Sequence, residues 1–103
     1  MNDKVYSMLG LAQKAGELVS GDEICEMTIK SKKCFLVVIA KDASDRTKKK
    51  FVDMCNFRNI RFLEYGQKEQ LGNCIGKGIR SVVTIKNVNF AKKIEELIKD
   101  RNE

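Results

Sequence analysis

The feature that most constrains the fold is an uninterrupted apolar run that ends in a helix-capping turn. Residues 35–40 are all apolar and lack the alternation of a strand with one face in water. This pattern predicts a buried strand with helices over both faces. Asp42 and Ser44 follow directly, and their side-chain oxygens are typical caps of a helix N-terminus. A buried strand that leads into a capped helix indicates an α/β domain.

Strands and helices alternate along the rest of the chain, and no proline, repeat or low-complexity segment interrupts them. We therefore expect one domain over residues 1–103, built as a three-layer α/β/α sandwich with a central mixed sheet of about four strands. The predicted strands are 18–20, 35–40, 60–64 and 80–85. The predicted helices are one capped by Asn2 or Asp3 that ends at Gly16, then 21–31, 44–57, 67–75 and one that starts at Asn87.

The apolar spacing also predicts which side chains are buried. In the second predicted helix, Ile24, Met27 and Thr28 share one side, which we assign to the core. Four phenylalanines fall in core periodicity, so the sequence offers no array of aromatic rings for stacking on single-stranded bases. These four residues are Phe35, Phe51, Phe62 and Phe90.

The residue types exclude several classes of function. The chain has no histidine, and its four cysteines are dispersed without a Cys-x-x-Cys pair, so we expect no structural metal site, no cofactor and no catalytic residues. Small buried or half-buried thiols are the expected role of the cysteines. The formal net charge of +6 favours anionic partners. Because neither a membrane span nor a secretory signal is recognisable, the sequence predicts a cytoplasmic location and no membrane partner.

The basic run at residues 48–50 is the most conspicuous candidate for nucleic-acid binding. Successive helical residues point about 100° apart, so these three lysines cannot all face one phosphate backbone. A solvated helix surface is therefore the favoured interpretation. Asp42 has no partner acid in its sequence neighbourhood, which favours a capping role over a catalytic one.

Two glycine turns are better candidates for a binding site. Gly21 lies between a strand and a helix, where backbone can approach closely and N–H groups remain free, although ordinary capping is the favoured reading of this turn taken alone. Gly72, Gly76 and Gly78 surround the turn before the last strand. That segment lacks the Gly-Lys-Ser/Thr order of a phosphate loop, so nucleotide binding is disfavoured. The loop instead offers cations and an apolar residue that suit splayed RNA.

Three motifs resemble the bacterial YlxQ-like branch of the ribosomal protein L-seven-Ae family. They are Leu9-Gly-Leu-Ala-Gln-Lys-Ala-Gly-Glu-Leu-Val-Ser-Gly21, Leu36-Val-Val-Ile-Ala-Lys-Asp-Ala-Ser44 and Leu71-Gly-Asn-Cys-Ile-Gly-Lys77. The resemblance extends over almost the whole chain. It implies an α/β/α sandwich and non-enzymatic binding of structured RNA, either ribosomal RNA or another kink-turn-like RNA, on or near the ribosome. The residues it assigns to the RNA contact are Ser20, Gly21, Asp22, Glu23, Lys77, Gly78, Ile79 and Arg80.

The chain departs from the family pattern at the start of the second predicted helix. The resemblance implies Gly-x-Asn-Glu-x-x-Lys there. This sequence instead has Glu23, Ile24 and Met27 at the positions of the asparagine, the glutamate and the lysine. An amide that reads a base edge and a cation that faces phosphate are thus absent. Lys14 and Lys30 are candidates to restore the charge. The alternative interpretation is a protein-interaction module on the ribosome or on an RNA-processing particle, without kink-turn specificity.

Overall fold

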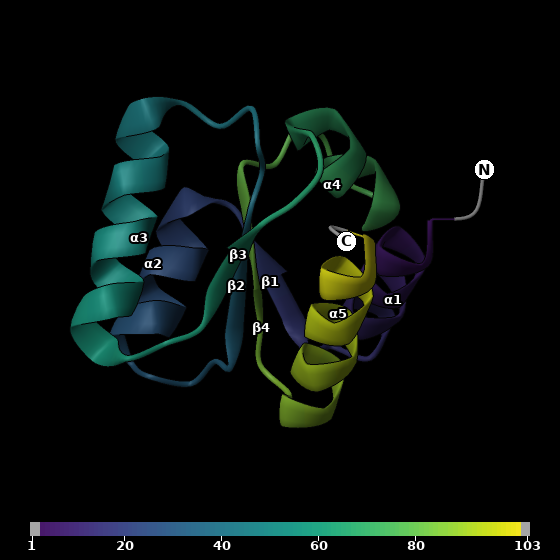
Figure 1. Cartoon of the computed structure of the whole chain (residues 1–103), viewed down its shortest axis with the longest axis horizontal. Helices are drawn as coiled ribbons and strands as arrows, with labels where there is room; N and C mark the ends of the chain where they lie inside the picture. The colour runs from purple at the N-terminus through teal and green to yellow at the C-terminus, as the bar shows by residue number, and fades with distance from the viewer. Residues whose placement is uncertain (1–2, 102–103) are drawn as a thin grey trace.

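The computed structural model describes residues 3–101 as a four-stranded sheet between two layers of helices. Helices α2 and α3 cover one face of the sheet, and α1, α4 and α5 cover the other (Figure 1). The α/β/α sandwich predicted from the sequence is therefore confirmed. The elements are α1 (Lys4–Lys14), β1 (Leu18–Ser20), α2 (Asp22–Lys30), β2 (Leu36–Ile39), α3 (Asp45–Arg58), β3 (Phe62–Glu64), α4 (Lys68–Cys74), β4 (Val82–Ile85) and α5 (Val88–Arg101).

The sheet is mixed and has the strand order β1-β4-β2-β3. Strands β2 and β3 are parallel, whereas β4 is antiparallel to both of its neighbours. Every residue of β2 is buried, as the uninterrupted apolar run predicts, and so is every residue of β4. In the orientation of Figure 1, the upper end of the sheet is where β1 and β2 end and β4 begins, and the lower end is where β2 and β3 begin and β4 ends.

Side-chain caps begin several of the helices. Asp3 accepts hydrogen bonds from the first N–H groups of α1, and Ser44 accepts one from Thr47 at the start of α3. The predicted capping role of Asp42 is confirmed, but the helix it caps is α4 rather than α3. Asp42 Oδ1 accepts a hydrogen bond from the Lys68 N–H at 2.8 Å. The predicted capping by Asn2 lies outside the described residues. Capping satisfies N–H groups that have no partner within their own helix.

Two predictions about buried side chains are wrong. The core face of α2 consists of Cys25 and Ile29, whereas Ile24 is 53% and Met27 70% exposed. Both pairs have a helical spacing of three or four, so periodicity alone could not choose between them. Phe35 is 50% exposed because it precedes β2, beyond the cover of the helices.

The basic run of α3 forms ion pairs with three different carboxylates. Lys49 pairs with Asp53 in its own helix, Lys48 with Glu64 of β3, and Lys50 with Glu26 of α2. The lysines therefore point in different directions, as predicted from the helical geometry. The hydrogen bond from Lys50 holds the pKa of the Glu26 carboxyl below its ordinary value.

The cysteines are small core residues, as the sequence predicts. Cys25, Cys34 and Cys55 are buried, and Cys74 is partly buried. Burial raises the pKa of the Cys25 and Cys55 thiols to about 12, so both remain protonated at neutral pH. Within residues 3–101, no group of three or more side chains is arranged as a metal site. No helix in this part of the chain has the length and apolar character needed to cross a membrane.

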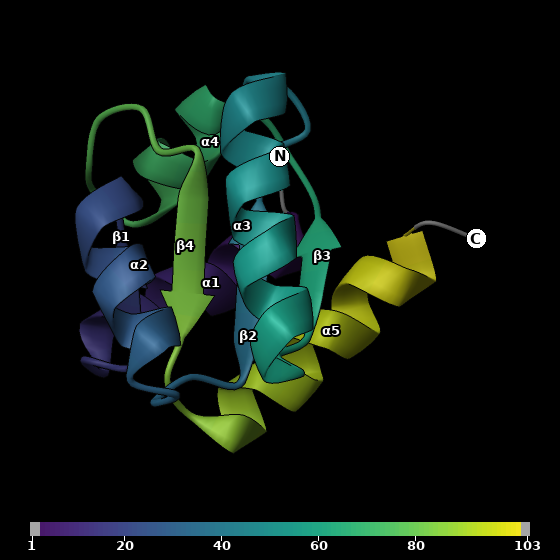
Figure 2. The ribbon, with the colours of Figure 1, turned by 90° about the vertical axis from the view of Figure 1, so that its left-hand side faces the viewer.

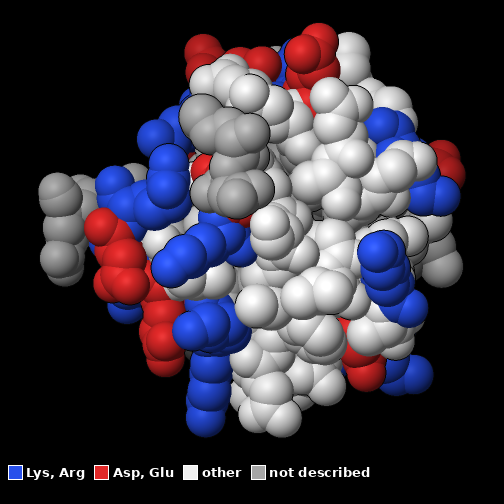
Figure 3. Space-filling view, turned by 90° about the vertical axis from the view of Figure 1, so that its right-hand side faces the viewer, with Lys and Arg blue, Asp and Glu red and all other residues white. Residues whose placement is uncertain are grey.

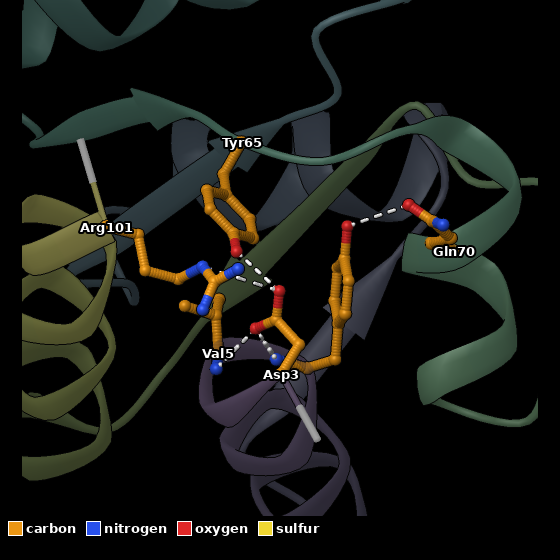
Figure 4. A network of polar contacts seen from close by, with 6 residues as sticks. Asp3, Val5, Tyr65, Gln70 and Arg101 are labelled. Carbon is orange, nitrogen blue, oxygen red and sulfur yellow. Dashed lines mark hydrogen bonds and ion pairs between the residues drawn. The ribbon is translucent and has the colours of Figure 1, made fainter. Parts of the chain in front are cut away.

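A polar cluster joins the first and last helices to the segment after β3 (Figure 4). The Tyr65 hydroxyl donates a hydrogen bond to Asp3 Oδ2 at 2.6 Å, and Arg101 lies 3.7 Å from the same oxygen. The Tyr6 ring lies 5.6 Å from the Tyr65 ring, centroid to centroid, and its hydroxyl bonds to Gln70 of α4. Burial and the Asp3 carboxylate together raise the pKa of Tyr65 to about 12.

We expect the Tyr65 ionisation to make the protein less stable at alkaline pH. Between the ordinary pKa of 10.0 and the folded value of about 12, the unfolded chain releases this proton while the folded protein retains it. The free energy of unfolding therefore falls as the pH rises through this window. Urea unfolding at a series of pH values should show that the free energy of unfolding falls less steeply with pH in Tyr65→Phe than in the parent protein. Lysine ionisation affects both proteins alike, so an identical slope would contradict the assignment.

Candidate nucleic-acid interface

The two glycine turns singled out in the sequence meet at the upper end of the sheet. Strand β1 ends at Ser20 and β4 begins at Val82, and their antiparallel pairing brings these two ends together. The Gly21 N–H donates to the Val82 carbonyl at 3.2 Å. From the loop before β4, Arg80 Nε donates to Ser20 Oγ at 3.0 Å. A side-chain hydrogen bond thus joins the two segments that the family resemblance assigned to RNA.

A surface hollow of about 230 Å³ lies between these segments. Its walls come from the last turn of α1, from β1, from the start of α2 and from the loop before β4. Apolar side chains line the hollow together with two cations, one side-chain amide and one hydroxyl. The lining residues are Gln13, Leu18, Val19, Ser20, Ile24, Lys77 and Arg80.

The backbone at Gly21 makes the sharp turn from β1 into α2. Its φ of 95° lies in a region that favours glycine, and no side chain caps the helix there. Asp22 and Glu23 are exposed in the first helical turn, where carboxylates interact favourably with the helix dipole. Acidic groups therefore adjoin the hollow in sequence, next to Ile24 of its lining.

The loop at residues 77–80 is held close against α4, beside the start of α2 (Figure 2). The Lys77 N–H donates to the Gly72 carbonyl at 2.8 Å, and the Arg80 N–H donates to the Lys68 carbonyl at 3.1 Å. Gly72 is buried, and a Cβ added there would lie 1.6 Å from the Gly78 carbonyl oxygen. Only a glycine lets the helix and the loop approach this closely. Ile79 remains 65% exposed on the loop.

The predicted site residues divide into three groups. Ser20, Lys77 and Arg80 line the hollow. Gly21, Asp22, Glu23, Gly78 and Ile79 adjoin these residues in the same two segments. The structure does not bring Lys14 and Lys30 into the lining.

Both outlying lysines have other surroundings. Lys30 is in the last turn of α2 and pairs with Glu26 at 3.3 Å. It lies roughly 12 Å along the helix from Asp22, given about 1.5 Å of rise per residue. Lys14 is exposed on the α1 face, where it lines a separate hollow with Leu11 and Cys74. Figure 3 shows a broad uncharged area on this side of the molecule, with charged side chains around it. Neither of the two hollows lined by Tyr6 and Cys74 includes a residue of the loop at 77–80 or of the turn at Gly21.

Four lining residues were not among the predicted site residues, namely Gln13, Leu18, Val19 and Ile24. Leu18 and Val19 were predicted only as strand residues. Ile24 was assigned to the core because α2 has two possible apolar faces. No local sequence pattern marks Gln13 as a site residue, because it reaches the hollow only through the packing of the end of α1 beside β1. Met27, one turn after Ile24, lines a separate hollow on α2 with Glu23, Glu26 and Lys30, so two predicted site residues, Glu23 and Lys30, share that second hollow.

The fold and this hollow define a small mixed-sheet α/β/α domain whose candidate site is formed by a helix start and a glycine-containing loop. The chain belongs to the Ribosomal protein L7Ae/L30e/S12e/Gadd45 family, whose model matches residues 3–95. The resemblance inferred from the three sequence motifs is thereby confirmed.

The chain is similar over most of its length to two curated proteins named RNA-binding protein YlxQ. The one from Bacillus subtilis is 34% identical over 93 residues, which are 90% of this chain and 93% of the relative. The one from Enterococcus faecium is 37% identical over 95 residues, which are 92% and 91% of the two chains. A solved protein of unknown function from Bacillus halodurans superposes with a TM-score of 0.91 at 35% identity, covering 95% of this chain and 99% of that one.

Proposed function

We propose that this protein is a non-enzymatic RNA-binding protein that holds structured RNA against the hollow and its rim. The observation that carries the proposal is the Arg80–Ser20 hydrogen bond, which joins the two predicted contact segments beside an open hollow lined by apolar side chains and cations. The names of the two curated relatives support RNA as the ligand. Free N–H groups at a helix start and neighbouring cations suit phosphate, and exposed apolar side chains suit unstacked bases.

The rim residues offer distinct contacts to such an RNA. Lys77 and Arg80 would bind phosphate oxygens, and Ile79 would contact the face of a splayed base. Gln13 is the one amide side chain in the lining, so it is our candidate for hydrogen bonding to a base edge. Glu23 can accept a hydrogen bond from an exocyclic amino group, as carboxylates do with cytosine.

Within this function, we propose an RNA of the kink-turn type, on or near the ribosome in the cytoplasm. The three positions where the sequence departs from the family pattern, Glu23, Ile24 and Met27, are all exposed on α2. Their exposure supports a role in ligand contact rather than in folding. The exposed Ile24 and Met27 replace polar contacts of that pattern with apolar ones. We therefore expect the RNA affinity of this protein to depend less on salt than that of a protein with lysine at position 27.

Removing the Arg80 side chain is expected to weaken RNA binding. Arg80→Ala should lower the affinity for a kink-turn RNA by roughly 5- to 150-fold, the range for about 1–3 kcal/mol, and reduce the salt slope by about 1. Gel shifts against a kink-turn and a straight duplex of equal length provide the measurement. Arg46→Ala removes an exposed arginine at the start of α3 and is the matched control.

Two results would contradict this proposal. If the parent protein binds the kink-turn and the straight duplex equally, kink-turn specificity is wrong. If Arg80→Ala and Arg46→Ala lower the affinity by the same factor, the hollow is not the contact surface and only the net charge matters.

The second candidate is a protein-interaction module on a ribosomal or RNA-processing particle. The observation that favours it is the group of exposed apolar side chains around the hollow, Ile24, Met27 and Ile79. Groups of exposed apolar residues mark protein contacts as well as ligand sites. Pull-down with ribosomal particles before and after ribonuclease treatment separates the two functions, since a protein contact survives removal of the RNA.

A further inference from the structure

The lower end of the sheet carries a second surface with a different composition. On the side of α2 and α3, it combines two exposed aromatic rings with four cations. We call these six residues the basic aromatic patch. They are Lys32, Lys33, Phe35, Phe57, Arg58 and Lys86.

Phe35 and Lys86 are neighbours across two strands. Leu36 pairs with Ile85 in the antiparallel register, and the Phe35 N–H donates to the Ile85 carbonyl at 2.9 Å. Phe35 therefore meets β4 at Ile85, and Lys86 is the next residue along that chain segment. Side chains alternate along a strand, so Lys86 shares the face of Thr84. The Thr84 side chain lies beside the Cys25 thiol of α2, and α2 packs against β4, so this face is on the α2 side of the sheet.

Phe57 lies on the α2 side of α3 and is 82% exposed. It follows Lys50 by seven residues, or about two helical turns, so the two residues share one stripe of the helix. Lys50 Nζ lies 2.5 Å from Glu26 Oε2 of α2, so this stripe of α3 faces α2. Phe57 is roughly 10 Å further toward the lower end, where α2 also ends. The Arg58 guanidinium lies 5.2 Å from the centroid of the Phe57 ring, within range of a cation–π interaction.

Acidic side chains are absent from the segments that form this surface. Residues 27–41, 54–63 and 70–94 contain no aspartate or glutamate. Among the residues that the structure describes, Lys32, Lys33 and Lys86 form no ion pair, unlike the lysines of the run at 48–50. Glu17 is the acidic neighbour of Lys86, since its carbonyl accepts the Lys86 N–H at 2.8 Å, but Lys32 and Lys33 lie in an acid-free segment. The patch therefore keeps a net positive charge.

We propose that the basic aromatic patch binds a single-stranded segment of RNA, with bases on Phe35 and Phe57 and phosphates near the lysines. Aromatic rings spaced among cations are the usual elements of single-strand binding, because every base has a stacking face. A regular duplex exposes few such faces, so it suits this surface less. The patch lies at the opposite end of the sheet from the hollow and does not depend on RNA binding there. Binding at both ends would let one domain hold a folded RNA and its single-stranded flank.

Removal of the two rings tests the stacking. The probe is a uridine-rich single strand of about 12 nucleotides, within the usual site size of a small domain, and the readout is fluorescence anisotropy. Phe35→Ala/Phe57→Ala should lower the affinity at least 5-fold, the lower limit for loss of one stacked base. Both rings are half exposed or more, so the variant should keep the parent melting temperature. Leu11→Ala, which removes an apolar side chain 51% exposed on α1, is the control and should bind as the parent does.

Neutralising two lysines tests the phosphate contacts. Lys32→Gln/Lys33→Gln should reduce the single-strand salt slope by about 1.4, since each lost phosphate contact is worth about 0.7. Lys4→Gln/Lys41→Gln changes the net charge equally at exposed sites elsewhere and should change the slope less. Arg80→Ala should leave single-strand binding intact, so failure of the patch and failure of the hollow give different results.

Three outcomes would overturn the proposal. One is equal loss of affinity in the patch lysine variant and its charge-matched control. Another is unchanged single-strand binding in the double phenylalanine variant. The third is a double phenylalanine variant that no longer binds phosphatidylserine vesicles but still binds the RNA strand. That result would make the patch a lipid-binding surface.

Discussion

Replacing Gly72 by alanine is expected to destabilise the protein by about 3 kcal/mol, the upper part of the range for overpacking. The added Cβ would lie 1.6 Å from the Gly78 carbonyl oxygen and 2.6 Å from its carbon, both backbone atoms that cannot swing aside as a flexible side chain would. Alanine favours the helix over glycine by about 1 kcal/mol, but the clash outweighs this gain. Because total stability is typically about 5–15 kcal/mol, the loss would be large.

The same substitution should also disturb the candidate RNA site. Relief of the clash requires the loop at residues 77–80 to move away from α4, which breaks the Lys77–Gly72 backbone hydrogen bond. Arg80 would then lose its position beside Ser20. We therefore expect Gly72→Ala to lower RNA affinity even at temperatures where the variant is folded.

Gly78→Ala is the matched control for this prediction. Nothing lies within 4 Å of a Cβ added at Gly78, although its carbonyl is the partner in the clash at Gly72. Its stability should change by less than about 0.5 kcal/mol. Urea unfolding and RNA gel shifts on both variants provide the measurement. Parent-like stability and RNA affinity of Gly72→Ala would show that the helix and the loop are not in close backbone contact.

Phe51→Ala is expected to cost about 3–5 kcal/mol of unfolding free energy, as removal of a fully buried aromatic ring leaves a cavity. Phe51 is 0% exposed and lies on the sheet-facing side of α3 with Cys55. The ring joins α3 to the core, so its loss weakens the whole layer of helices on that face. The unfolding midpoint should fall with little change in the slope against denaturant.

Phe57 provides an internal comparison for Phe51 in the same helix. It is 82% exposed, so Phe57→Ala should change stability by less than about 0.5 kcal/mol. Chemical unfolding of the two variants side by side measures the difference, and equal losses would contradict the burial of Phe51 on α3. The same comparison separates core packing from the binding role proposed for Phe57.

The fold could be predicted from local sequence signals, whereas part of the site could not. The uninterrupted apolar run and the cap at Ser44 act within a few residues, and the structure confirms both. For α2, by contrast, two faces had equally plausible apolar spacing, and the sheet packed against Cys25 and Ile29. That choice left Ile24 at the hollow.

The sequence by itself determined the element order, the buried strands and the two glycine turns, because hydrophobic periodicity and backbone freedom are properties of short segments. Only the tertiary structure decided that those turns meet, since strand pairing between β1 and β4 joins residues about sixty positions apart, as in the Arg80–Ser20 hydrogen bond. It also decided that the lysines at 48–50 are paired while Phe35 and Phe57 remain exposed among cations. Contacts of this kind depend on which faces the helices present after packing, and no short sequence pattern encodes them.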